Sequence, residues 1–112
     1  GWKDVVKMAY NVVNGGYVDA AIRHAKAKDV GVIGMKVAMA VATHHKPLQP
    51  VPEWRIEMVE RIVPGDWKAP QKAYLWALQN PRISAVISNL WDETHVRENL
   101  ALAGRKVEFR SA

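Results

Sequence analysis

The stretch APQKAYLWALQNPRISAVISNLWDETHVRENLALAG, residues 69–104, alternates between two kinds of local pattern. Residues 69–80 repeat apolar side chains at helical spacing and stop at Pro81, which cannot continue a helix. Residues 82–89 contain several β-branched side chains and predict a strand, whereas residues 92–104 return to helical spacing. A strand between two helices is the building unit of an α/β fold, so this stretch predicts the fold class of the chain.

Both helices in this stretch carry residue types that suit helix ends. Pro70 falls in the first turn of the first helix, where its missing N–H costs no intrahelical hydrogen bond. Asp92 or Glu93 lies near the start of the last helix, where a carboxylate can accept from unpaired backbone N–H groups, and Gly104 suits its C-cap. The spacing also predicts one core-facing side of the first helix, made of Ala73, Trp76, Ala77 and Asn80.

The N-terminal part of the chain shows the same alternation. Residues 4–14 predict a strand that leads into an Asn-Gly-Gly turn, and residues 17–29 predict a short amphipathic helix. Residues 30–42 are apolar on both faces, as a strand buried in a parallel sheet should be. Within that strand, Gly31 and Gly34 would permit close packing inside a barrel or against a helix.

The middle of the chain, residues 41–68, interrupts this pattern. It begins with a proline-rich loop, because three prolines cannot lie in a central strand or a helix interior. An inserted helix follows, with Trp54, Met58 and Ile62 expected on its core-facing stripe. The predicted order is therefore β-α-β-(loop, helix)-α-β-α, which implies parallel strands joined by right-handed crossovers.

Length and composition narrow the class of protein. A chain of 112 residues, 49% of them hydrophobic, is expected to form a single domain over residues 1–112. It has no apolar run long enough to span a bilayer, no secretory signal pattern at its start and no cysteine, which fits a cytoplasmic protein. The net charge of +5 is spread among acidic residues, so nucleic-acid binding is disfavoured.

Three pieces of the sequence together resemble the aldo-keto reductase family. They are MAYNVVN (8–14), GVIGMKVAMA (31–40) and KAYLWALQNPRISAVISNLWDETHVRENLALA (72–103), the second being similar to a family branch with a Gly-Val-Ile-x-Met-Lys strand. The resemblance implies a partial TIM barrel. The three predicted strands would be the sixth, seventh and eighth strands of a (β/α)₈ barrel, so the chain would hold only its last βα units.

The activity that this resemblance implies is hydride transfer between NADPH or NADH and a carbonyl or alcohol. The family's catalytic Tyr, Asp, Lys and His come from the first half of the barrel, so no catalytic residue is carried onto this chain. Tyr10, Tyr17 and Tyr74 are not substitutes. The chain alone is expected to be inactive and to supply part of the site for the cofactor, NADP or NAD.

The resemblance also assigns cofactor-binding positions. The turn from Ser88 to Leu90 would turn its backbone N–H groups toward the phosphates at a helix N-terminus. Glu98 and Asn99 match the family's Glu-Asn pair, which touches the adenine, and His95 stands where many members have an arginine for the 2′-phosphate. Met35 falls near the position of a side chain stacked on the nicotinamide. The implied cofactor-binding residues are thus Ser88, Asn89, Leu90, His95, Glu98, Asn99 and Met35.

Two other features have both a functional and a structural interpretation. His44 and His45, with His24 and His95, could be metal ligands, but adjacent histidines point in different directions, so a solvated loop is favoured and no metal is expected. Lys36 ends an apolar run and could be a buried base or a phosphate contact, or could extend to the mouth of the barrel.

Parallel strands cut from a barrel would leave two unpaired edges and one face with nothing opposite it. We therefore expect the isolated chain to associate, either with copies of itself as a homo-oligomer or with the missing N-terminal half-barrel. An alternative function is a non-catalytic assembly or interaction module that keeps the shape of the family. A weaker alternative is nucleic-acid binding driven by the +5 charge.

Overall fold

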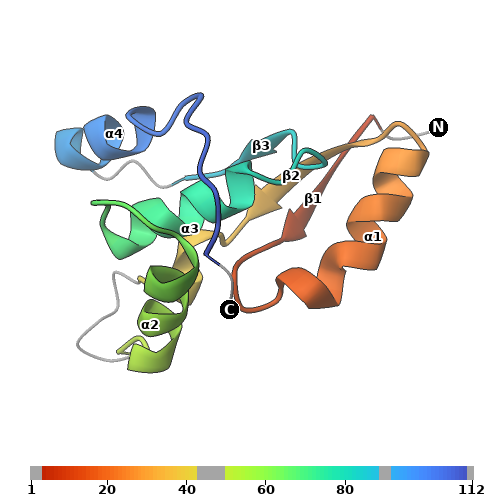
Figure 1. The fold of residues 1–112 in the computed structure, drawn as a ribbon. Coiled ribbons are helices and arrows are strands. Elements are labelled where there is room, and N and C mark those ends of the chain that lie inside the picture. The colour runs from red at the N-terminus through yellow and green to blue at the C-terminus, as the bar shows by residue number, and fades with distance from the viewer. Residues whose placement is uncertain (1–3, 43–49, 89–91, 111–112) are drawn as a thin grey trace.

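The computed structural model describes residues 4–42, 50–88 and 92–110, folded as alternating strands and helices (Figure 1). In chain order the elements are β1 (Val5–Ala9), α1 (Gly15–Ala27), β2 (Gly31–Met35), the short 3₁₀ helix η1 (Ala38–Ala40), α2 (Glu53–Ile62), α3 (Ala69–Leu78), β3 (Ala85–Val86) and α4 (Glu93–Leu100). This order confirms the predicted alternation, with one helix inserted between β2 and α3.

The strands form one parallel sheet in the order β1-β2-β3. Val6 pairs with Val32, and Gly34 pairs with both Met8 and Val86, so each strand lies beside the next one in the sequence. The predicted α/β class with parallel strands is confirmed. Within the described part of the chain β1 and β3 each pair on one side only, so the sheet is open and its closure into a barrel stays a prediction.

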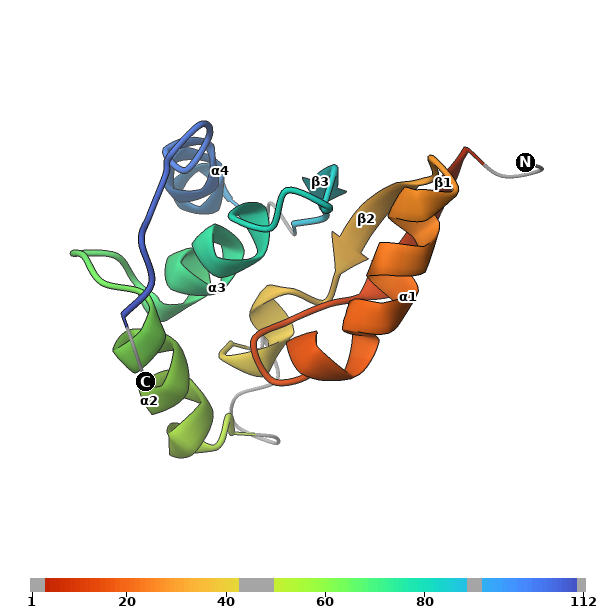
Figure 2. The ribbon, with the colours of Figure 1, turned by 45° about the vertical axis from the view of Figure 1, so that its right-hand side comes forward.

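The described helices cover one face of this sheet, and no described helix covers the other. Val32 is completely buried, and Val6 and Val86 pack against the core from the same face. Helix α1 contacts β2, and α3 contacts β3 (Figure 2). Because side chains alternate along a strand, Val5 and Ile87 lie on the opposite face, where they are 50% and 44% exposed.

Helix α3 is buried on most sides because it packs against α2, η1 and β3. Lys72 is buried in this helix, and its ammonium group reaches the carboxylate of Glu60 on α2 at 2.8 Å. The predicted core face is correct for Ala73 and Ala77, which are buried, and for Trp76, which packs against the core, but it is too narrow. The buried positions of α3 are Lys72, Ala73, Tyr74, Leu75 and Ala77.

Strand β2 is much shorter than the predicted strand at 30–42. It ends at Met35 because Lys36 has a backbone φ of 57°, a left-handed conformation that cannot continue a strand. The chain then turns into η1. The first and third strands also end earlier than predicted, at Ala9 and Val86.

The predicted core stripe of α2 is wrong at its first position. Trp54 is 53% exposed, whereas Met58 and Ile62 pack against the core as expected and Val59 is fully buried. Helix α2 packs on α3, and Ile56 in its first turn also packs against the core, so the buried stripe passes beside Trp54 and not through it. Of the proline-rich loop expected before this helix, residues 43–49 lie outside the described part of the chain.

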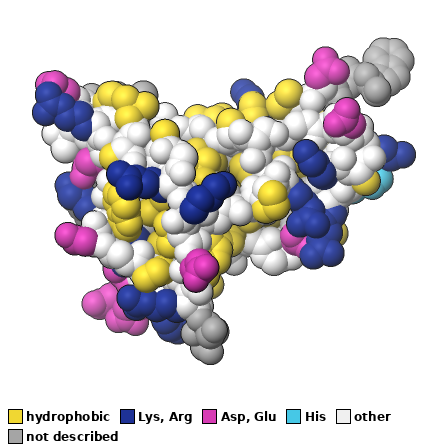
Figure 3. Space-filling model, turned by 45° about the horizontal axis from the view of Figure 1, so that its top comes forward, with side chains coloured by type: hydrophobic (Ala, Val, Ile, Leu, Met, Phe, Trp, Pro, Cys, Tyr) yellow, Lys and Arg dark blue, Asp and Glu magenta, His cyan; other side chains and the backbone are white. Residues whose placement is uncertain are grey.

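The surface carries charges of both signs. On the face shown in Figure 3, Lys and Arg side chains lie in separate groups with Asp and Glu between them. Hydrophobic side chains reach the surface between these groups. None of the helices in the described ranges has the length and apolar character needed to cross a bilayer.

Candidate functional site at the carboxyl ends of the strands

The carboxyl ends of the strands meet at one edge of the sheet, because the strands are parallel. Ligands of α/β proteins bind at this edge, both in barrels and in open sheets. Of the residues predicted to bind a cofactor, Met35 ends β2 and Ser88 follows β3 by two residues. The pairing of Gly34 with Val86 places Met35 and Ser88 at this same edge.

Helix α4 is joined to the end of β3 by one side-chain contact. The Asn99 amide nitrogen donates to the Ser88 hydroxyl oxygen at 2.6 Å, and the contact is partly buried. The structure thus brings together two of the predicted cofactor-binding residues, which are eleven positions apart in the sequence. The other two residues of the predicted turn, Asn89 and Leu90, lie outside the described part of the chain.

Glu98 faces the N-terminal end of α3. Its carboxylate is 2.5 Å from the ammonium group of Lys68, and its backbone oxygen accepts from the Gln71 amide at 3.0 Å. The Glu98 side chain is 21% exposed and Lys68 is far more exposed. An adenine at Glu98 would therefore share this carboxylate with Lys68.

The first turn of α4 is capped as predicted. The Asp92 carboxylate accepts from the backbone N–H of His95 at 2.9 Å, which satisfies one of the unpaired donors at the helix start. The imidazole of His95 is exposed, with its Nδ1 3.7 Å from the same carboxylate. His95 lies one helical turn before Asn99 on α4, with its imidazole directed to solvent.

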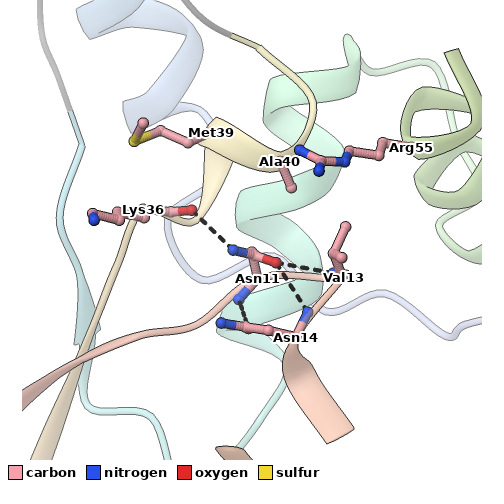
Figure 4. Close-up of a pocket in the computed structure, with 7 residues that line it drawn as sticks. All are labelled: Asn11, Val13, Asn14, Lys36, Met39, Ala40 and Arg55. Atoms are coloured by element: carbon pink, nitrogen blue, oxygen red, sulfur yellow. Dashed lines mark hydrogen bonds between the residues drawn. The ribbon is translucent and has the colours of Figure 1, made fainter. Parts of the chain in front are cut away.

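A hollow of about 290 Å³ opens at the same edge of the sheet, at the ends of β1 and β2 (Figure 4). The sequence singled out only Lys36 among its residues, because the walls come from three separate segments: the turn after β1, the segment after β2 and the first turn of α2. The two asparagines after β1, Asn11 and Asn14, were a further sign in the sequence that polar groups gather at this edge. The residues that line the hollow are Asn11, Val13, Asn14, Lys36, Met39, Ala40 and Arg55.

The turn after β1 is held by its own asparagines. The Asn11 backbone N–H donates to the Asn14 side-chain oxygen at 2.8 Å, and the Asn11 side-chain oxygen accepts from the N–H groups of Val13 and Asn14. The Asn14 amide donates back to the Ala9 carbonyl at 3.1 Å. These local bonds explain why β1 stops here, because Asn side chains replace the sheet partners of the backbone.

Tyr10 anchors this turn to the core. Its ring is stacked on Trp76 with 4.8 Å between centroids, and its hydroxyl oxygen accepts from the Asn80 amide at 3.0 Å. Burial raises the pKa of Tyr10 above its usual 10.0, the bond from Asn80 opposes the rise, and the charge of Asp19 adds to it. The phenol is therefore a buried structural group that resists ionisation.

This pKa shift predicts a loss of stability in alkali. The unfolded chain releases the Tyr10 proton before the folded chain does, so the contribution is complete below pH 10 and falls as the pH rises toward the folded pKa, by at most about 1.4 kcal/mol per pH unit. Urea unfolding between pH 9 and about 11.5 should show a shallower decline for Tyr10→Phe than for Tyr17→Phe, which changes an exposed tyrosine. Equal slopes for the two variants would contradict this role.

Neither a cluster of metal ligands in the described residues nor a similar known protein identifies the function of this site. In residues 4–42, 50–88 and 92–110 no three His, Asp or Glu side chains are placed to hold a metal ion, and His44 and His45 lie outside these ranges. No family model, no curated protein and no solved structure matches the chain. A function for the chain must therefore come from the geometry and chemistry of its own residues.

Proposed function

We propose that the chain supplies the C-terminal, nucleotide-binding part of an NAD(P)-dependent oxidoreductase of the aldo-keto reductase type. Such an enzyme reduces carbonyls or oxidises alcohols by hydride transfer. The parallel order β1-β2-β3, with helices on one face of the sheet only, supports this proposal, because consecutive strands of a (β/α)₈ barrel are arranged in this way. The absence of cysteine from the sequence fits the reducing cytoplasm, which we propose as its compartment.

The observation that carries the proposal is the bond between Asn99 and Ser88. It fixes α4 against the end of β3, so that an adenine group near Asn99 and a phosphate near Ser88 would lie at neighbouring positions along one nucleotide. Glu98 supplies an acceptor beside Asn99, and Met35 lies at the same edge of the sheet, where the nicotinamide would be placed. The catalytic groups would come from βα units outside this chain.

The cofactor supplies the hydride in this proposal, and the chain's own residues hold and orient it. The Asn99 amide can both donate to and accept from an adenine edge, and the Glu98 carboxylate accepts from an exocyclic amino group. The N-terminus of α4 already receives the Asp92 carboxylate, so an incoming phosphate would have to share or displace that cap. This competition limits how strongly the chain alone holds a phosphate.

NADPH and NADH binding tests the proposal. We expect saturable quenching of tryptophan fluorescence in the wild-type chain, and a loss of affinity of about tenfold for Asn99→Ala, which corresponds to about 1.4 kcal/mol for one hydrogen-bonded contact. Thr94→Ala, an exposed position on the same helix, is the matched control and should bind as the wild type does. Equal affinity in both variants, or no saturable binding to the wild type, would count against a nucleotide site.

An interaction module that keeps the shape of the family is the second candidate function. The uncovered face of the sheet favours it, since Val5 and Ile87 expose apolar side chains there. On this hypothesis the chain would associate through that face but would not bind a nucleotide. The fluorescence titration therefore separates the two candidates.

A further inference from the structure

The hollow at the ends of β1 and β2 contains a cation with unmet hydrogen-bonding capacity. The Nε of Arg55 is buried and has no hydrogen-bond partner, and Arg55 is in none of the ion pairs formed by the described residues. Its guanidinium lies 5.5 Å from the ring centroid of Trp54, which helps to fix its direction. A buried polar group without a partner is rare in folded proteins and calls for a ligand or another explanation.

The surroundings of this guanidinium suit a negative charge. Figure 4 shows Arg55 reaching from α2 to Ala40, with Asn11 and Val13 below them in the view. No described Asp or Glu lines the hollow. The ammonium group of Lys36 points away from Arg55, so the guanidinium is the cation that faces the hollow (Figure 4).

Asn11 offers a second donor. Its amide nitrogen makes one long bond, 3.4 Å, to the Lys36 carbonyl, while its side-chain oxygen is fully used by the N–H groups of Val13 and Asn14. The amide nitrogen thus has a proton left for a ligand. An oxyanion between this amide and the Nη protons of Arg55 would be held by the outer, forked side of the guanidinium, while the buried Nε keeps the same delocalised charge directed at the hollow.

We propose that this hollow binds the phosphate or carboxylate group of a small ligand, with Arg55 as its main contact and Asn11 as its second. The volume of about 290 Å³ is at the lower limit for small-molecule sites, so it fits one oxyanion and a few further atoms but not a whole dinucleotide. The site goes beyond the proposed nucleotide function and does not depend on it, because none of its residues belongs to the pair Ser88 and Asn99.

Titration of the full 112-residue chain with inorganic phosphate, and separately with acetate, at constant ionic strength tests this site. The probe is the NMR signal of the Arg55 Nε–H group, which is assigned by its loss in Arg55→Gln. We expect this signal to shift and saturate at millimolar ligand. Saturation by phosphate alone identifies a phosphate ligand, saturation by acetate alone a carboxylate, and the absence of a saturable shift with either overturns the site.

Two variants with matched controls give a second measurement. Bound anion raises the unfolding temperature of the wild type, and this rise should be lost in Arg55→Gln but kept in Arg61→Gln, which removes an exposed charge from the same helix. Asn11→Asp keeps the acceptor oxygen of the turn but repels an anion, so it should weaken binding at least about tenfold. Ala20→Asp adds the same charge on α1 and should bind normally. Equal effects in variant and control would overturn the proposal.

The nucleotide proposal and this site can fail separately. Asn99→Ala should bind inorganic phosphate as the wild type does, and Arg55→Gln should keep its NADPH affinity. If the rise in unfolding temperature caused by phosphate is lost in Asn99→Ala but kept in Arg55→Gln, the anion binds at the end of β3 and the assignment to the hollow is wrong.

Discussion

Gly15→Ala is expected to lower the free energy of unfolding by about 2 kcal/mol, whereas Gly16→Ala should leave it unchanged or raise it by about 0.5 kcal/mol. A methyl group on Gly15 would lie 2.5 Å from the Trp76 ring, and one on Gly16 would meet no atom within 4 Å. Both glycines lie in the first turn of α1. Adjacent residues with the same chemistry therefore give opposite results.

The Trp76 ring cannot easily move aside, because it is stacked on the buried ring of Tyr10. Relief of the clash would separate this pair or shift the start of α1 away from α3. Urea unfolding at one protein concentration measures the two free energies. Trp76→Phe removes the ring atoms nearest Gly15, so in that background Gly15→Ala should cost clearly less than in the wild type. An equal cost in both backgrounds would show that the clash is not the cause.

The type and order of the elements could be predicted from the sequence because each rests on local periodicity. The helical spacing in α1 reflects the side on which it packs, with Ile22 and Ala25 buried, and Asp92 caps α4 through a hydrogen bond to the residue three positions later. Bonds of this kind depend on neighbours in the chain. Their residue types are therefore visible in the sequence.

The misses have tertiary causes. Lys36 ends β2 with a left-handed backbone conformation, which a lysine in a sequence does not predict. Lys72 is buried because α2 places Glu60 beside it, and no spacing within α3 reveals that partner. Arg55 joins the hollow because the fold places the first turn of α2 beside the ends of β1 and β2. The contact between Ser88 and Asn99 could be anticipated only through the resemblance to a family, since the two residues lie on different elements.

The uncovered sheet face leads to the second large prediction, which concerns association. Val5, Ile33 and Ile87 lie on one face, where Val5 and Ile87 are 50% and 44% exposed and Ile33 is partly buried. Among the residues that the structure describes, β1 and β3 each have one unpaired edge. An apolar face bounded by open strand edges is a template for pairing with further strands, so the isolated chain should associate at micromolar concentration.

Val5→Glu combined with Ile87→Glu should shift this association toward monomer by about a hundredfold in dissociation constant, because two unpaired carboxylates would have to be buried in the interface. Tyr17→Glu, at a side chain that is 93% exposed on α1, adds a charge elsewhere and should leave the association unchanged. Light scattering over a range of concentrations measures both. A wild-type chain that stays monomeric and unfolds cooperatively would show that the sheet is stable without strands from another chain. If the wild type and the double variant associate equally, the copies are held together by the strand edges and the sheet face stays exposed to solvent. That outcome would contradict the barrel, because the interior face of a barrel is buried.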